Sequence, residues 1–188
     1  MSVLNAFLAT WSGARATFGM GSPEGGAAFD GSGHLRQLEA DVQSAAPGPR
    51  WTGTASSAYG TANADHGRVL GQMAGLDQRL VTEVDRSAQV VAAGRRDLDA
   101  ARKWVLDMAA TVPQNQAGER MLLPVVKKGI GDVTDIINRS NSELNGIGGR
   151  IRGIAGEYQA LGNQKFGGKE GEPDIVGITG DDPDEPKP

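Results

Sequence analysis

Few side chains in this sequence could carry out chemistry, and their spacing matches no common catalytic pattern. The 188 residues contain no cysteine and two histidines, which excludes a thiolate nucleophile and makes a structural zinc site improbable. Asp132 and Asp135 could act as acid and base only in a pocket that shifts their pKa values apart. The Gly-x-Ser-x-Gly, Gly-Lys-Ser/Thr and His-Glu-x-x-His motifs are absent. We therefore predict no enzymatic activity, no metal and no cofactor.

A recognition site is better supported, and it begins at a tryptophan turn. Trp51 and Gly53 directly follow a Pro-Gly-Pro-Arg segment, where an indole can lie against helix ends while glycine permits a tight backbone. Tyr59, Asn63 and His66 follow at spacings of four and three, which places them on one helix face near the same end. The alternative is that both aromatic residues cap the core and that His66 is an interior histidine.

Two long helices must position these residues. Apolar side chains recur at steps of three and four from residue 55 to 108, which predicts one helix from about Thr54 to Thr111, on the order of 85 Å long. A second such pattern between Leu122 and Leu161 predicts an antiparallel partner, broken or bent near Gly129 to Gly131. Such a long amphipathic rod cannot bury its apolar stripe alone.

Two shorter helices are predicted before the long ones. The first runs from about Ser2 to Gly19, and a glycine-rich loop from Gly19 to Gly33 follows it. The second carries its apolar residues from Leu35 to Ala45, with Ser32 as its N-cap. The fold class expected is all-α: an elongated antiparallel helical bundle or hairpin with a very long central helix.

Charge and composition divide the chain into a helical module, residues 1–166, and a disordered acidic tail or linker rich in Pro and Gly, residues 167–188. The tail holds seven acids and two bases, a balance of −5, whereas the whole chain carries −4. The module is therefore close to neutral, which argues against nucleic acid as a partner. No apolar stretch is long enough to span a membrane, and the N-terminus lacks the features of a general secretory signal peptide.

Glycines at helical spacing form two ridges on the long helices. If the chain turns back near position 114, residues 75 and 153 lie opposite each other, and we predict that the ridges face one another and let the backbones approach closely. The alternative is that residues 146–149 simply break the helix. The glycines are Gly67, Gly71 and Gly75 on the first helix and Gly146, Gly149, Gly153 and Gly156 on the second.

The sequence resembles a known family around the tryptophan turn. A Trp-x-Gly turn between two helices is similar to that of the WXG-type helical proteins exported by type VII secretion systems of actinobacteria. The longer pattern resembles the N-terminal region of the EspA/EspE group of type VII effectors in mycobacteria, over Ala27 to about Leu106. The residues that carry it are Trp51-Thr52-Gly53-Thr54-Ala55, then Tyr59, Asn63 and His66, then Leu76-Asp77-Gln78-Arg79-Leu80.

The resemblance implies a helical hairpin that is secreted folded, often with a helical partner or as the leading part of a larger effector. Trp51 and Gly53 would correspond to one half of a composite recognition surface. The other half, a tyrosine followed four residues later by an acid, is missing, because Tyr59 precedes Asn63 and Tyr158 precedes Gly162. Either a partner supplies that element or a looser signal operates.

The function predicted is that of a non-enzymatic helical module of a type VII secretion substrate, secreted to the cell envelope or beyond. The secretion machinery, or a helical partner or chaperone, would recognise it folded, and it could form homo- or hetero-oligomers. Trp51, Gly53 and Tyr59 would make the contact, and Asn63 and His66 would shape its edge. One alternative is the export domain of a larger toxin or hydrolase whose active domain follows residue 188. The other is a structural coiled-coil protein.

Overall fold

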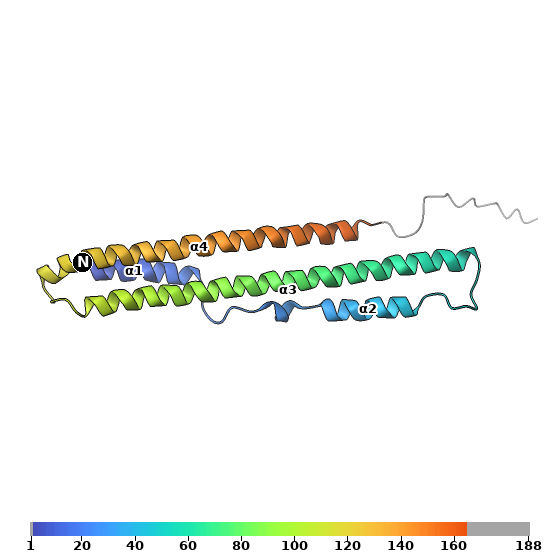
Figure 1. Ribbon diagram of the computed structural model, residues 1–188, viewed down its shortest axis with the longest axis horizontal. Coiled ribbons are helices and arrows are strands. Elements are labelled where there is room, and N and C mark those ends of the chain that lie inside the picture. The colour runs from blue at the N-terminus through green and yellow to red at the C-terminus, as the bar shows by residue number, and fades with distance from the viewer. Residues whose placement is uncertain (1, 165–188) are drawn as a thin grey trace, which may run out of the picture.

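The computed structural model describes residues 2–164, and every regular element in that range is a helix. The two longest, α3 and α4, lie side by side and antiparallel, and the first turns of α3 extend beyond the end of α4, so the described residues form a rod (Figure 1). The predicted all-α class with a very long central helix is confirmed, since α3 has 56 residues and is about 84 Å long. The predicted tail, residues 167–188, lies outside the described residues. The elements are α1 (Val3–Thr17), a 3-10 turn η1 (Gly26–Phe29), α2 (Ser32–Ser44), α3 (Thr54–Ala109) and α4 (Gln116–Gly162).

Side-chain and backbone caps explain where the helices begin. The carboxamide oxygen of Asn115 accepts hydrogen bonds from two backbone N–H groups of the first turn of α4, both at 3.0 Å. At α2 the predicted N-cap is one residue too late, because Gly31 holds that position and Ser32 begins the helix. The carboxylate of Asp30 instead accepts from the Ser32 backbone N–H at 2.9 Å, and hydrogen bonds from Ser32 lower the pKa of Asp30.

The two short helices cover different parts of the rod (Figure 1). α1 packs in the angle between α3 and α4 near the turn that joins them, where the completely buried side chains of Phe7, Leu98, Val105 and Val133 form the larger core. α2 packs on α3 alone, near the tryptophan turn. There, a smaller cluster seals α3 against α4: Val69, Leu76, Ile154 and Leu161.

The segment between α1 and α2 is fastened to α3 by three charged side chains. Arg95 donates to the Phe18 carbonyl, with Nε at 3.1 Å, and to the carbonyl of Gly21. Asp85 accepts from the backbone N–H of Gly26 at 2.7 Å, and Asp77 accepts from that of Gly31 at 2.5 Å. Because charge-assisted hydrogen bonds are stronger than neutral ones, these contacts fix the path of the glycine-rich loop.

The prediction that the two glycine ridges face each other is wrong. A Cβ atom added at any of four of these glycines would have no other atom within 4 Å: Gly75, Gly149, Gly153 and Gly156. An added Cβ at Gly67 or Gly71 would instead meet side chains of α2, at 3.6 and 2.8 Å. The spacing of the glycines was correct, but spacing does not reveal which side of α3 each neighbour covers. The alternative of a broken helix at residues 146–149 is also wrong, since α4 is continuous.

The close approaches occur at other glycines. A Cβ added at Gly129 would lie 2.5 Å from Val105 Cγ2 and 2.9 Å from the ring of Phe7, so this position is a hollow into which α1 and α3 pack. The same holds at Gly94, where the ring of Phe18 would be 2.3 Å away. The predicted break near residues 129–131 is therefore wrong, because packing against two neighbouring helices compensates the poor helix propensity of Gly129.

Candidate functional site

The tryptophan turn is held in one conformation by local hydrogen bonds. The backbone N–H of Trp51 donates to the carbonyl of Gly48 at 3.0 Å, and the hydroxyl of Ser56 donates to the carbonyl of Trp51 at 2.7 Å. Gly53 precedes α3 with a φ of 105°, a backbone conformation that favours glycine. These hydrogen bonds and the φ of Gly53 hold the turn in this conformation without a bound partner.

Two aromatic side chains at this turn form an exposed pair at one end of the rod. The rings of Trp51 and Tyr59 are tilted by 44° with centroids 5.2 Å apart, a favourable geometry for aromatic rings. Trp51 is 47% exposed and Tyr59 is 42% exposed, and neither belongs to the buried clusters of the described chain. The alternative in which both cap the hydrophobic core is therefore not what the structure shows.

Asn63 does not share the exposed setting of this pair, and the role of His66 at its edge stays a prediction. Asn63 is only 8% exposed, and its amide nitrogen donates to the carbonyl of Val42 near the end of α2 at 2.6 Å. Asn63 therefore fastens α2 to α3 and does not shape the edge of an exposed surface. His66 is exposed, so the idea of an interior histidine is wrong. The structure brings together Trp51, Gly53 and Tyr59 from the predicted set.

Replacing Asn63 with alanine is expected to lower the free energy of unfolding by about 1–3 kcal/mol, because the Val42 carbonyl would lose its side-chain partner in a part-buried site. Thermal unfolding of both proteins, followed by circular dichroism, measures the difference. Asn5, which is exposed on α1, offers a control, and its alanine variant is expected to unfold like the wild type. An equal loss in both variants would contradict the role given to Asn63.

The second tyrosine of the chain is turned inward, toward the interface of the two long helices. The hydroxyl of Tyr158 donates to the carbonyl of Met73 at 3.2 Å and lies 3.5 Å from a carboxylate oxygen of Asp77. Burial raises the pKa of Tyr158, and the negative charge of Asp77 adds to that effect. Tyr158 is therefore committed to packing α4 against α3.

The Leu-Asp-Gln-Arg-Leu segment, quoted above for its resemblance, joins three elements. Asp77 holds the loop before α2, and the Gln78 carboxamide accepts from Arg36 of α2 at 3.1 Å. Arg79 makes two hydrogen bonds to Glu157 of α4, at 2.7 and 2.8 Å, and these bonds lower the pKa of Glu157. Spacing alone did not reveal this role, although three consecutive polar residues inside an apolar repeat are a signal of it.

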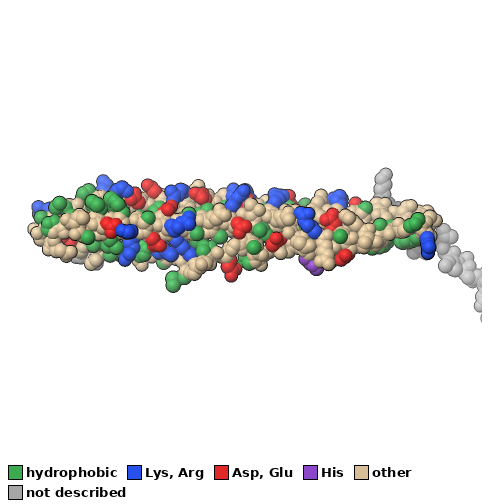
Figure 2. All heavy atoms as spheres, turned by 60° about the horizontal axis from the view of Figure 1, so that its bottom comes forward, with side chains coloured by type: hydrophobic (Ala, Val, Ile, Leu, Met, Phe, Trp, Pro, Cys, Tyr) green, Lys and Arg blue, Asp and Glu red, His purple; other side chains and the backbone are tan. Residues whose placement is uncertain are grey.

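The two carboxylates considered for acid and base chemistry both lie on α4. Asp132 pairs with Lys128 one turn earlier in α4, and Asp135 is exposed. Basic and acidic side chains alternate along the face that Figure 2 shows, with no continuous basic stripe. None of the helices in residues 2–164 combines the length and apolar character needed to cross a membrane.

The stretch of the chain that contains the tryptophan turn is similar in sequence to known proteins. Residues 18–100 match the sequence model of the EspA/EspE family, and this stretch includes η1, α2, the tryptophan turn and most of α3. The ESX-1 secretion-associated protein EspE of Mycolicibacterium smegmatis is 26% identical over 158 residues, which cover 79% of this chain but 30% of that relative. No solved structure matches the chain. The predicted resemblance to the EspA/EspE group is confirmed, while the likeness to WXG-type proteins stays a prediction.

Proposed function

We propose that this EspA/EspE-like chain is a folded helical module of a type VII secretion substrate, recognised through its tryptophan turn by the secretion machinery or by a helical partner protein. The similarity to an ESX-1 secretion-associated protein supports the secretion role. The observation that carries the proposal is the exposed pair of Trp51 and Tyr59 at one end of the rod, inside the stretch that matches the family.

The geometry of the turn is suited to binding. Tryptophan and tyrosine are enriched among the residues that dominate binding energy, since a large ring can be desolvated with little loss of rotamer entropy. Here the backbone hydrogen bonds of Trp51 and the positive φ of Gly53 fix the turn in advance. A partner therefore has little conformational entropy to remove on binding. No bond is made or broken in this mechanism.

Replacing Trp51 with alanine is expected to reduce export strongly while thermal stability stays near the wild-type value, because the indole is half exposed and lies outside the buried clusters of the described residues. The measurement is the amount of chain in culture filtrate relative to the cell lysate, in strains with and without the secretion ATPase. Phe29, which is 55% exposed on η1 away from the turn, provides the matched control. Its alanine variant is expected to be exported like the wild type.

Two outcomes would contradict the proposal. If the alanine variant of Trp51 loses its helical circular dichroism together with export, the indole serves the fold. If export does not depend on the secretion ATPase in any variant, the chain is not a substrate of that system, and a structural coiled-coil role becomes the better explanation.

One observation favours the alternative in which the chain is the export module of a larger protein. The matched region covers only 30% of the EspE relative, so the relative contains much sequence with no counterpart here. Reading the frame beyond residue 188 tests this alternative. A stop codon at that point contradicts it, and a further coding domain supports it. The absence of enzymatic activity stays a prediction.

A further inference from the structure

A continuous groove runs between α3 and α4 along the middle of the rod. Three adjoining hollows of about 540, 400 and 450 Å³ make up this groove, and neighbouring hollows share the side chains of Arg86, Arg150 and Arg79. On α3 it extends from Gln72 to Ala93, a length of about 32 Å. α1 lies nearer the end where α3 joins α4, and α2 contacts α3 alone, so neither helix covers it (Figure 1).

The other half of the molecule shows how a helix occupies such a site. α1 seats the ring of Phe7 over Gly129 and the ring of Phe18 over Gly94, so that glycines of α4 and α3 receive large apolar side chains. In the uncovered groove, Gly75, Gly146 and Gly153 line the hollows, and beyond an Arg150 guanidinium near Gly146 nothing lies above them. No helix of the described residues covers this groove.

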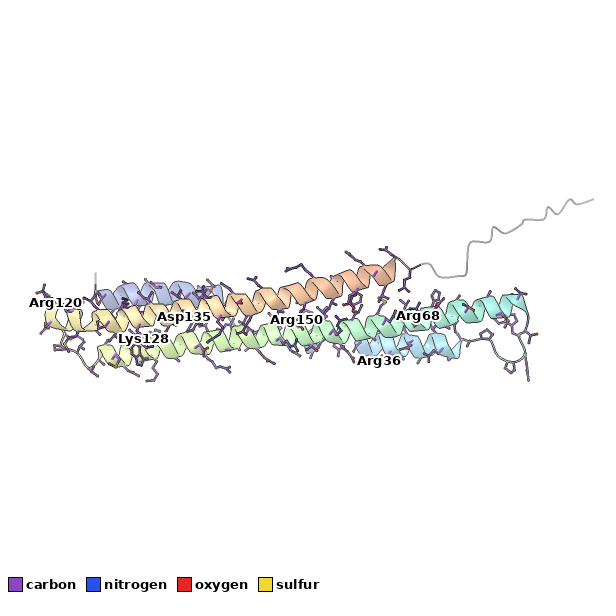
Figure 3. The ribbon with its side chains drawn as sticks, turned by 45° about the horizontal axis from the view of Figure 1, so that its top comes forward. Arg36, Arg68, Arg120, Lys128, Asp135 and Arg150 are labelled. Atoms are coloured by element: carbon purple, nitrogen blue, oxygen red, sulfur yellow. The ribbon has the colours of Figure 1, made fainter. Side chains whose placement is uncertain are left out.

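Charges along the groove indicate what kind of helix would fit. At its middle a single carboxylate, Glu83, is shared by two arginines: Arg86 lies 2.6 Å from one oxygen and Arg150 lies 2.9 Å from the other. The Glu83 side chain is 8% exposed, whereas the side chains of both arginines are half exposed, so the middle presents an excess of positive charge. Figure 3 shows Arg150 midway along the rod, between α4 and α3.

The two ends of the groove differ from its middle. Near the tryptophan turn, Arg79 and Glu157 neutralise each other. At the other end Glu143 lines the groove, seven residues or about 10 Å before Arg150 on α4. A complementary helix would therefore carry an acidic residue at its middle and a basic residue two turns away on the same face.

We propose that this groove binds one amphipathic helix of a protein partner, with large apolar side chains seated over Gly146 and Gly153 and an acidic side chain between Arg86 and Arg150. This is the helix-in-groove mode of recognition, in which anchors at steps of three and four fill apolar hollows. The site lies along the side of the rod and does not depend on the role proposed for Trp51. It also gives a function to Gly153, which has no other atom above it.

The test uses the full 188-residue chain and a synthetic peptide as probe. The peptide is a fluorescein-labelled helix of 22 residues with leucines at steps of three and four, glutamate at position 11 and lysine at position 18. Fluorescence anisotropy is expected to show saturable binding. Gly146→Leu or Gly153→Leu fills the groove and is expected to weaken binding about tenfold or more, since each displaces a buried apolar anchor. A peptide with lysine at position 11 is expected to bind about tenfold more weakly.

Matched controls lie on the same helix. Gly149 and Gly156 have open space above them but do not line the hollows, so their leucine variants are expected to bind within about twofold of the wild type. Leucine favours helix over glycine, so all four variants should keep their helical circular dichroism. The Trp51→Ala variant is expected to bind the peptide normally, which separates this proposal from the export role.

Three results would overturn the proposal. The first is the absence of saturable binding to the wild-type chain, and the second is an equal loss in the Gly149→Leu control. The third is a wild-type dimer, detected by light scattering after size exclusion, that Gly146→Leu dissociates, because a second copy of the chain would then be the occupant.

Discussion

Replacing Phe7 with alanine is expected to lower the free energy of unfolding by about 3–5 kcal/mol, the range typical of a fully buried phenylalanine. Its ring is 0% exposed and packs over Gly129 against Val105, where α1, α3 and α4 meet. Because Phe7 is the one large side chain of α1 that is fully buried among the described residues, its loss should also loosen this helix from the rod. Urea unfolding followed by far-ultraviolet circular dichroism gives the free energy.

A local signal accompanies that loss. The indole of Trp11 on α1 donates to the carbonyl of Leu98 on α3 at 2.8 Å, so its fluorescence reports whether α1 is seated. We expect the Trp11 emission of the Phe7→Ala variant to shift toward that of exposed indole at urea concentrations that leave the wild type unchanged. Phe29→Ala makes the same chemical change at an exposed position and should cost less than about 0.5 kcal/mol. A similar loss of unfolding free energy in both variants would contradict the role given to Phe7 in the core.

Two identical substitutions on α4 are expected to have opposite signs. Gly129→Ala should destabilise the protein by about 1–3 kcal/mol, because the new methyl group would overlap the side chains of Val105 and Phe7 in a closed core. Gly156→Ala should stabilise it by about 0.5–1 kcal/mol, because nothing lies above that position and alanine is the better helix former. Thermal and urea unfolding of both variants check this pair. A gain in stability at Gly129 would show that the hollow can expand, contrary to the packing described.

The sequence predicted the elements well because each is a strong local signal. Apolar residues at steps of three and four persist through α3 for 56 residues without a proline, and only a helix satisfies such a pattern. The turn at Trp51 was predicted from the Pro-Gly-Pro-Arg segment and from Gly53, and Gly53 does adopt a φ that other residues avoid. The exposure of Trp51 was a prediction that tertiary structure could have overturned, and it did not.

The predictions that proved wrong depended on the rotation of one helix relative to another. Asn63 and Tyr59 are four residues apart and therefore neighbours on α3, yet α2 covers the first and leaves the second exposed. The glycine ridges failed for the same reason, because α4 packs on the side of α3 that carries Val69 and Leu76. Helical spacing gives the angle between two residues on one helix, whereas the position of the neighbouring helix depends on contacts distant in sequence.

Because α3 and α4 pack side by side as one pair, the described rod is narrow across its long axis. A compact globule of 188 residues has a radius of gyration of about 16 Å and is thus about 40 Å across in every direction. Helices are about 10–12 Å thick, so a section through two or three of them spans roughly 25 Å. The described rod can therefore travel lengthwise through an aperture too tight for a globule of equal mass, without releasing any of its interhelical contacts.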